Sequence, residues 1–412
     1  MKKTYLSGLL TGVASAVIVF AIVVTLMLSG NQIFQSDSTD TKKETVEATE
    51  DSAIKKEINT KIDMLEQFIN QYYLNDVDKT AYADSIYKGV LNSLEDPYSV
   101  YFTKEEYAAM QETSSGTYTG IGATVSQDVK TGIITIVKPF VKGPAYEAGI
   151  LPGDAIYKIE GEEVTGLDLT EVVSRMKGQE KTEVKISIIR EGESEPIELT
   201  VVRRKIEVPT IEYEMLEDSI GYIRVSEFDE VTAKQYRAAL SDLETKGMKG
   251  LVVDLRDNPG GLLTTVVDML DRMLPEGMIV YTKDKNGQGD EYKSTSEEQF
   301  DKPLVVLING NSASASEVFA GAIQDYKIGE LVGTTSFGKG IVQSIIPLQD
   351  GTAIKLTVSK YYTPKGRNIH EIGIEPEVEV ELDDALKQKV VIEKEEDNQL
   401  QKAISTVKEK MK

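Results

Sequence analysis

The stretch Asn309-Gly-Asn-Ser-Ala-Ser-Ala-Ser-Glu317 joins two segments of different pattern. Before it, Leu304–Ile308 is an unbroken apolar run, short enough to be a buried parallel strand. After it, Glu317–Gln324 carries apolar residues at helical spacing. The stretch is therefore predicted to connect the end of a strand to the start of a helix. Its small side chains let the backbone bend sharply there, and the helix start leaves N–H groups unpaired.

Ser312, Ser314 and Ser316 occupy alternate positions on this bend. A serine on such a bend is exposed, and the amides around it can stabilise an oxyanion. For any one of these serines, an N-cap in a segment of small packing residues is the simpler interpretation. The choice depends on whether the chain offers the base that a nucleophilic serine requires.

A serine hydroxyl becomes a good nucleophile only when a base takes its proton. The chain has one histidine, His370, in a Gly-flanked segment that favours a structural loop role, and it has no cysteine. A lysine made neutral by burial is the remaining common base. Lys339 lies among small residues within Thr334–Gln343, ahead of an alternating, strand-like run. A Ser–Lys dyad is thus predicted, with Ser314 or a neighbouring serine attacking and Lys339 as base.

Three motifs resemble, in order, those of the C-terminal processing (tail-specific) peptidases, a family of PDZ-containing Ser–Lys proteases. They are Asp254-Leu-Arg-Asp-Asn-Pro-Gly-Gly261, Asn309–Glu317 and Gly338-Lys-Gly-Ile-Val-Gln343. The resemblance extends from about Ala53 to the C-terminus. Arg256 and Asp257, inside the first motif, are interpreted as structural ties of a loop.

The resemblance assigns a role to five positions. It implies that Ser314 is the nucleophile, that Lys339 is the general base and that Gln343 orients the lysine. It also implies that the backbone N–H groups of Gly261 and Ala315 hold the oxyanion.

The composition excludes several classes of partner. The 412 residues include 46 basic and 68 acidic side chains, and the net charge of −22 argues against nucleic acid or an anionic membrane surface as a partner. The absence of cysteine excludes disulfides and thiolate metal sites.

Two segments imitate ligand-binding motifs. Gly333–Lys339 nearly matches a phosphate-binding P-loop, but Gly340 stands where a Ser or Thr should bind magnesium, and a strand is expected to follow. Asp284–Gly289 imitates a calcium loop whose twelfth position is Thr295 instead of Glu, so a hairpin turn is predicted. No cofactor and no metal ion are expected.

The N-terminus predicts a membrane anchor over residues 1–35. No charge lies between Lys3 and Asp37, and Val17–Leu28 with its flanks is long enough to span a bilayer. Lysines precede the apolar run and acidic residues follow it, which places the N-terminus in the cytoplasm and the remainder outside. A cleaved signal peptide is the competing interpretation. The polar segment 36–52 is predicted to be a flexible stalk.

Residues 53–103 are predicted to form an N-terminal helical region. Apolar residues from Ile58 to Tyr73 recur at helical spacing, and a second helix is expected to stop before Asp96-Pro97. Leu91-Asn-Ser-Leu-Glu-Asp-Pro-Tyr-Ser99 is similar to the family segment that precedes the PDZ domain. The resemblance implies that these helices support a homodimer.

Residues 104–204 resemble a PDZ domain, on the strength of Gly143–Ile156 with its Pro-Gly-Asp turn. The resemblance implies that a carboxylate-binding loop holds the C-terminus of a peptide that adds a strand. The helix Leu169–Lys177 would flank that peptide, and either Arg175 or Lys177 would sense it. The four loop residues are Gly120, Ile121, Gly122 and Ala123.

Residues 205–382 alternate strands and helices, which predicts an α/β peptidase core with a largely parallel sheet. Asp254–Gly261 follows a strand at its carboxyl end, where such sheets place their ligands. Residues 383–412 are predicted to form a helical tail from Asp383. The fold class is therefore α+β and multi-domain, with the transmembrane helix, the helical region and the PDZ domain preceding the core.

These expectations combine into one functional hypothesis. The chain is predicted to be a membrane-anchored, extracytoplasmic serine endopeptidase that recognises the free C-termini of protein or peptide substrates. The alternative is a catalytically inactive PDZ adaptor that only binds chain ends. Intact Ser314, Lys339 and Gln343 disfavour the adaptor, which has no need to keep a buried lysine beside a serine.

Overall fold

The computed structural model describes residues 41–295, 299–389 and 391–412. The chain divides into two compact units, Met1–Tyr82 and Ala83–Lys412. The predicted anchor, Val17–Leu28, lies outside the described residues. None of the helices in the described ranges has both the length and the apolar character that a bilayer crossing requires.

The described part of the first unit is dominated by one long helix, α2 (Thr41–Tyr72). Most of the apolar residues that predicted this helix remain exposed on it, including Ile58 and Phe68. The prediction of a flexible stalk over 36–52 was wrong from Thr41 onward, because α2 already begins there. Lys, Glu and Ala in this segment are good helix formers, so low hydrophobicity does not prevent a helix.

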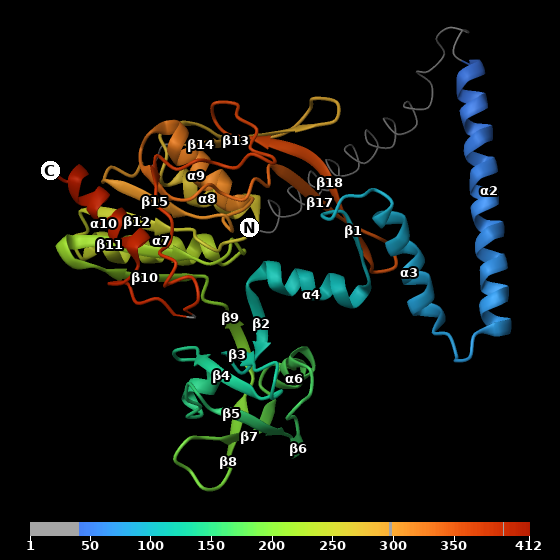
Figure 1. Ribbon diagram of the computed structural model, residues 1–412, viewed down its shortest axis with the longest axis horizontal. Helices are drawn as coiled ribbons and strands as arrows, with labels where there is room; N and C mark the ends of the chain where they lie inside the picture. The colour runs from blue at the N-terminus through green and yellow to red at the C-terminus, as the bar shows by residue number, and fades with distance from the viewer. Residues whose placement is uncertain (1–40, 296–298, 390) are drawn as a thin grey trace, which may run out of the picture. The chain divides into compact units, whose positions relative to one another are not determined.

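The PDZ-like domain is a mainly antiparallel sheet with two helices and a hydrophobic core of its own. The ribbon of β2 and β9 carries the chain into and out of it (Figure 1). Its elements are β2 (Thr117–Gly120), β3 (Ala123–Gln127), β4 (Ile134–Pro139), α5 (Pro144–Glu147), β5 (Ala155–Ile159), β6 (Glu162–Glu163), α6 (Leu169–Met176), β7 (Glu183–Ile189), β8 (Ile197–Val202) and β9 (Arg204–Glu207).

The peptidase core is built on a six-stranded sheet in the order β10-β11-β12-β15-β16-β19, parallel except for β10. Its strands are β10 (Ile211–Met215), β11 (Ile220–Val225), β12 (Gly250–Asp254), β15 (Leu304–Ile308), β16 (Glu330–Gly333) and β19 (Val378–Glu379). Between β10 and β11 lies the short 3-10 helix η1 (Glu217–Ser219). The predicted parallel sheet is confirmed.

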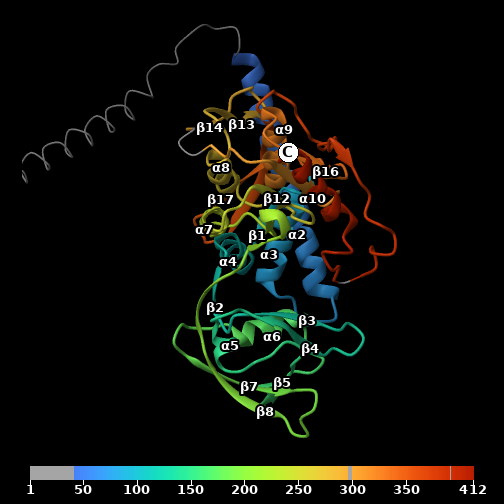
Figure 2. The same ribbon diagram turned by 90° about the vertical axis from the view of Figure 1, so that its left-hand side faces the viewer.

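Helices cover both faces of this sheet (Figures 1 and 2). In β15, Leu304, Val306 and Ile308 pack into the core that includes α7 (Thr232–Thr245), α8 (Leu263–Asp271) and α9 (Ala315–Tyr326). The alternate residues Val305 and Leu307 pack against α10 (Asn398–Lys410). Burial on both faces explains why this strand is apolar at every position.

A second sheet has the order β1-β18-β13-β14, and β17 pairs with β18. Its strands are β1 (Val100–Phe102), β13 (Gly277–Asp284), β14 (Glu291–Ser294), β17 (Ile341–Pro347) and β18 (Ala353–Tyr362). The antiparallel pair β13–β14 confirms the predicted hairpin. Helices α3 (Lys79–Asn92) and α4 (Lys104–Ser115) flank β1 in the sequence. Because β1 joins β18, the segment before β1 reaches this sheet: the Thr357 amide donates to Ser99 Oγ at 3.0 Å.

The tail differs from its prediction. Its helix begins at Asn398 and not at Asp383. The Asp397 carboxylate caps the helix by accepting from the Leu400 amide at 3.0 Å, and it also pairs with Arg256. This start is set by a tertiary contact as well as by the local pattern.

Candidate active site

Two loops meet at the carboxyl ends of the parallel strands β12 and β15. The hydroxyl of Ser312 donates to the Leu255 carbonyl at 2.8 Å, and that of Ser316 donates to the Asn258 carbonyl at 2.9 Å. The Ala313 amide also donates to Asn258, at 3.1 Å. These bonds join the Asp254–Gly261 loop to the serine-rich stretch at the sheet edge where α/β proteins place their ligands.

Ser314 differs from the other two serines. Ser312 and Ser316 are fully buried, whereas Ser314 is partly exposed. Ser314 immediately precedes α9 with φ 55° and ψ −112°, a left-handed conformation that costs energy for a residue with a side chain. Such strain is found mainly at functional sites, where the surrounding structure holds it in place.

The two amides predicted as oxyanion donors lie next to this serine. A Cβ on Gly260 would come within 2.8 Å of Ser314 Cβ and 3.0 Å of Ala315 N, so only a glycine allows the loops to approach this closely. Gly261 follows directly. Among the described residues, no acceptor takes the N–H of Gly261 or of Ala315. Two unpaired amides beside an accessible serine suit the stabilisation of an oxyanion.

Lys339 is partly buried ahead of β17, and the strand-like run predicted after it is confirmed. Its ammonium lies 4.4 Å from the centre of the Tyr98 ring. Desolvation lowers the pKa of Lys339, the positive charge of Lys355 lowers it further, and Asp96 and Glu317 act in the opposite direction. A lowered pKa is what a lysine needs to act as a base near neutral pH.

The side chains of the predicted catalytic residues are not yet hydrogen-bonded to one another. Within the described ranges, Lys339 Nζ donates neither to Ser314 nor to Gln343. Gln343 instead donates to Thr357 Oγ1 at 3.3 Å. Catalytic hydrogen bonds are often long or absent without substrate, so this arrangement is compatible with a dyad that closes during the reaction.

The main chains of Ser314 and Lys339, by contrast, are firmly joined. The Glu317 carboxylate accepts from the Ser314 amide at 2.9 Å and from the Lys339 amide at 2.8 Å. The Tyr361 hydroxyl donates to the carbonyl oxygens of the same two residues, at 3.1 Å and 2.5 Å. The sequence analysis missed both Glu317 and Tyr361.

One of these residues had a signal in the sequence. Ser314-Ala-Ser-Glu317 has the Ser-x-x-Glu spacing of a capping box, in which the glutamate bonds back to the first amide. Tyr361 had no such signal, because only the pairing of β18 with β17 brings it to the site. Tyr98 lies in the family-like segment Leu91–Ser99, but only the pairing of β1 with β18 brings that segment to the site.

In the PDZ-like domain, the four predicted loop residues lie between β2 and β3. Ile121 is buried in the domain core, and Gly122 has φ 74°, which suits a glycine. Tyr118, which the sequence analysis missed, packs against Gly120, since a Cβ there would lie 2.9 Å from its ring. Lys177 Nζ lies 5.3 Å from the centre of the same ring.

The two candidate basic residues of this domain have different surroundings. Lys177 forms an ion pair with Glu112 of α4, and its Cα would lie 3.6 Å from a Cβ on Gly120. Arg175 pairs with Glu162 at 2.8 Å and with Glu171 at 2.7 Å. Of the two basic residues, Lys177 is therefore the one that lies beside the predicted carboxylate-binding loop, next to Gly120 and Tyr118.

Arg256 and Asp257, which were interpreted as structural ties of their loop, each bond to other segments of the chain. Arg256 pairs with Asp254 and Asp397, which links the β12 edge to the start of α10. Asp257 accepts from the side-chain amides of Asn309 and Asn311, both at 2.9 Å. The backbone of His370 packs against Gly340, where a Cβ would come within 2.5 Å of the histidine N.

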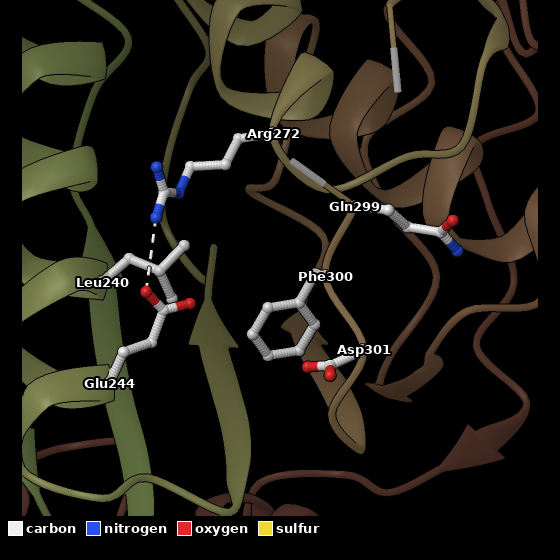
Figure 3. A pocket seen from close by; sticks show the side chains of 6 residues that line it. All are labelled: Leu240, Glu244, Arg272, Gln299, Phe300 and Asp301. Carbon is white, nitrogen blue, oxygen red and sulfur yellow. Dashed lines mark hydrogen bonds and ion pairs between the residues drawn. The ribbon is translucent and has the colours of Figure 1, made fainter. Parts of the chain in front are cut away.

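One surface hollow lies apart from these residues. Figure 3 shows its six lining side chains, with Arg272 paired to Glu244 at 3.3 Å. The lining consists of Leu240, Glu244, Arg272, Gln299, Phe300 and Asp301. It includes none of the predicted catalytic or PDZ residues.

Comparison with known proteins identifies the family. The carboxy-terminal processing protease CtpA of Bacillus subtilis is 40% identical over 323 residues, which cover 78% of this chain and 68% of the relative. The chain belongs to peptidase family S41. Residues 219–380 match the family model itself, residues 136–203 match a PDZ domain, and residues 18–106 match the N-terminal domain of the activating protease CtpB.

Other relatives of this S41 chain agree. The processing protease CtpB of Bacillus subtilis is 36% identical over 360 residues, covering 86% of the chain and 74% of the relative. A crystal structure from Bacteroides fragilis, described as an S41 protease, shares the fold with a TM-score of 0.52 at 17% identity, over 82% of this chain and 98% of that one. The chain is a carboxy-terminal processing serine protease of family S41, and the predicted resemblance is confirmed.

Proposed function

We propose that this S41 peptidase hydrolyses peptide bonds through a dyad of Ser314 and Lys339. Neutral Lys339 takes the hydroxyl proton while Ser314 Oγ attacks the substrate carbonyl, and the Gly261 and Ala315 amides hold the resulting oxyanion. The C–N bond breaks as the lysine passes its proton to the leaving amine, which leaves an acyl-enzyme. A water molecule, deprotonated by Lys339, then releases the acid and restores the serine.

The geometry around Ser314 carries this proposal. Ser314 is the accessible member of the three serines, and it is held in a strained conformation beside two unpaired amides. Its main chain shares two hydrogen-bonding partners, Glu317 and Tyr361, with that of Lys339. The lowered pKa of Lys339 supports its role as base. Gln343 would orient the lysine once the two side chains meet.

The membrane anchor and the location belong to the same proposal. The apolar run Val17–Leu28, with lysines before it and acidic residues after it, supports a single-pass anchor with the catalytic part outside the cytoplasm. Substrates would be proteins or peptides with free C-termini, recognised by the PDZ domain. Protease accessibility of the second unit in intact cells, compared with lysed cells, tests this orientation.

The decisive experiment is digestion of an unfolded protein by the purified chain, compared with Ser314→Ala and Lys339→Arg. Ser314→Ala should abolish turnover while leaving folding and peptide binding intact. Lys339→Arg keeps the charge but cannot act as a base, so it should be inactive. Activity of the arginine variant within about tenfold of the parent would contradict general-base catalysis, a role typically worth 10²–10⁴-fold.

A further inference from the structure

Glu317 and Tyr361 each bond to both halves of the proposed dyad. The Glu317 Oε2 atom accepts the amide hydrogens of Ser314 and Lys339, and the Tyr361 hydroxyl donates to the carbonyl oxygens of the same two residues. We propose that Glu317 and Tyr361 are positioning residues that set the spacing between nucleophile and base. This inference rests on the Ser314–Lys339 mechanism proposed above.

The surroundings of Glu317 fix its two carboxylate oxygens. Glu317 is fully buried, and besides the two amides on Oε2 its Oε1 accepts from Ser336 Oγ at 2.6 Å and from the Gly338 amide at 2.7 Å. Four donors therefore converge on one carboxylate, and a buried carboxylate with this many donors holds a single orientation. A glutamine there would present an NH2 group to two of these donors.

Tyr361 bonds to the carbonyl oxygens of the two residues and not to their amides. It is 2% exposed in β18, and its ring belongs to the hydrophobic core of the peptidase sheet. Burial, with the nearby charge of Glu317, raises the pKa of Tyr361 well above its usual range, so the hydroxyl keeps the proton that it donates. Removing the hydroxyl alone would leave the packing of the ring and delete the bonds to Ser314 and Lys339.

A positioning role predicts a specific kinetic signature. Both side chains are buried, Glu317 fully and Tyr361 at 2% exposed, so substrate binding should survive their conservative replacement. A displacement of about 1 Å between reacting groups can cost roughly 10²-fold in rate. Tyr361→Phe should therefore lower kcat by roughly 10- to 100-fold and leave KM within about twofold.

The test compares Tyr361→Phe with Tyr362→Phe in the full chain. Tyr362 is the next residue of β18 and stacks on Tyr281, 5.1 Å between ring centres, so it controls for the loss of one strand hydroxyl. Peptide kcat and KM, the rate at which a fluorophosphonate labels Ser314, and thermal unfolding are measured for both. The expected result is a loss of kcat and of labelling rate in Tyr361→Phe alone, with similar unfolding temperatures.

Equal kcat and labelling in the two tyrosine variants would overturn the positioning role of Tyr361. Should Tyr361→Phe fail to fold, Glu317→Gln decides by the same measurements: a selective loss of kcat supports the inference, and parental kcat contradicts it. Ser314→Ala and Lys339→Arg run in parallel. If Ser314→Ala and Lys339→Arg stay active, the proposed Ser314–Lys339 dyad is wrong. If they are inactive while Tyr361→Phe and Glu317→Gln are fully active, the dyad stands and only the positioning role is wrong.

Discussion

The ammonium of Lys339 lies 4.4 Å from the centre of the Tyr98 ring, so the proposed base rests on an aromatic face. Tyr98 belongs to the segment Asp96-Pro-Tyr-Ser99, which is fixed to β18 by the bond from the Thr357 amide to Ser99 Oγ. A cation over an aromatic ring is stabilised in its charged form. The Tyr98 ring therefore favours the charged form of Lys339, whereas desolvation favours the neutral form and lowers its pKa.

The first prediction is that Tyr98→Leu shifts the pH dependence of the peptidase. Activity should rise with pH as Lys339 loses its proton, and loss of the ring should lower the pKa of Lys339 further. A cation–π contact is worth about 0.5–2 kcal/mol, and about 1.4 kcal/mol corresponds to one pH unit. The acid limb of kcat/KM should thus move to lower pH by roughly 0.4–1.5 units.

Two further variants check this assignment. Tyr98→Phe keeps the ring, so its acid limb should coincide with that of the parent. Lys355→Met removes a charge that lowers the pKa of Lys339, so its acid limb should move to higher pH. A Tyr98→Leu profile that is unmoved, or that moves to higher pH, would show that the ring does not stabilise the protonated lysine.

The second prediction separates the three serines. Ser312→Ala and Ser316→Ala each delete a buried hydrogen bond to the Asp254–Gly261 loop, at 2.8 Å and 2.9 Å. Each should lower the free energy of unfolding by about 1–2 kcal/mol and keep measurable turnover. Ser314→Ala should show the reverse, with no turnover and little change in stability. Chemical denaturation measures the stability of each variant, and peptide hydrolysis measures its turnover. A folded but inactive Ser312→Ala beside an active Ser314→Ala would mean that Ser312, and not Ser314, is the nucleophile.

The peptidase sheet was predictable because its strands are buried on both faces. Such strands are nearly continuous apolar runs, and β15 accordingly coincides with the predicted run Leu304–Ile308. The serine and lysine loops were predictable too, since small residues at a strand end are a local pattern. Tyr361 was not, because it lies 47 residues beyond Ser314 and reaches it only through strand pairing.

The predictions for two segments, Thr41–Ser52 and the tail from Asp383, were wrong for related reasons. At Thr41–Ser52, a polar composition was interpreted as disorder although its residues favour a helix. In the tail, charged residues from Asp383 were interpreted as a helix, whereas Asp397 caps it later while it also binds Arg256. Local pattern alone does not contain that second contact.

The third prediction concerns Asp229, which is 7% exposed. Burial, with a smaller effect of Glu227, raises the pKa of Asp229 to about 6. The folded chain then binds this proton more tightly than the unfolded chain, so stability falls as pH rises from about 4 to about 6 and stays level above. Asp229→Asn should remove this loss and stabilise the chain above pH 6 by roughly 1–3 kcal/mol.

Chemical denaturation at a pH near 4 and a pH near 7.5 measures this difference, which should be small at the lower pH and largest at the higher one. Glu230→Gln is the matched control, because Glu230 is the next residue and is exposed. Its effect should stay within about 0.5 kcal/mol at both pH values. An Asp229→Asn chain that is less stable than the parent at the higher pH would contradict the raised pKa.

The last prediction concerns how substrates are selected. If Gly120–Ala123 bind a terminal carboxylate through their amides, only a free C-terminus gains the charge-assisted bond, which is worth about 1.5–3 kcal/mol. A peptide ending in a free apolar residue should therefore be cut with a KM roughly ten- to a hundredfold lower than the same peptide amidated.

Lys177→Met should weaken this preference, since Lys177 adjoins the loop, whereas Arg175→Met should preserve it because Arg175 is turned toward Glu162 and Glu171. Steady-state cleavage of both peptides by the parent chain and by the two variants measures the effect. Equal cleavage of the free and amidated peptides by the parent chain would mean that this domain does not recognise chain ends, even if Ser314 and Lys339 perform the hydrolysis.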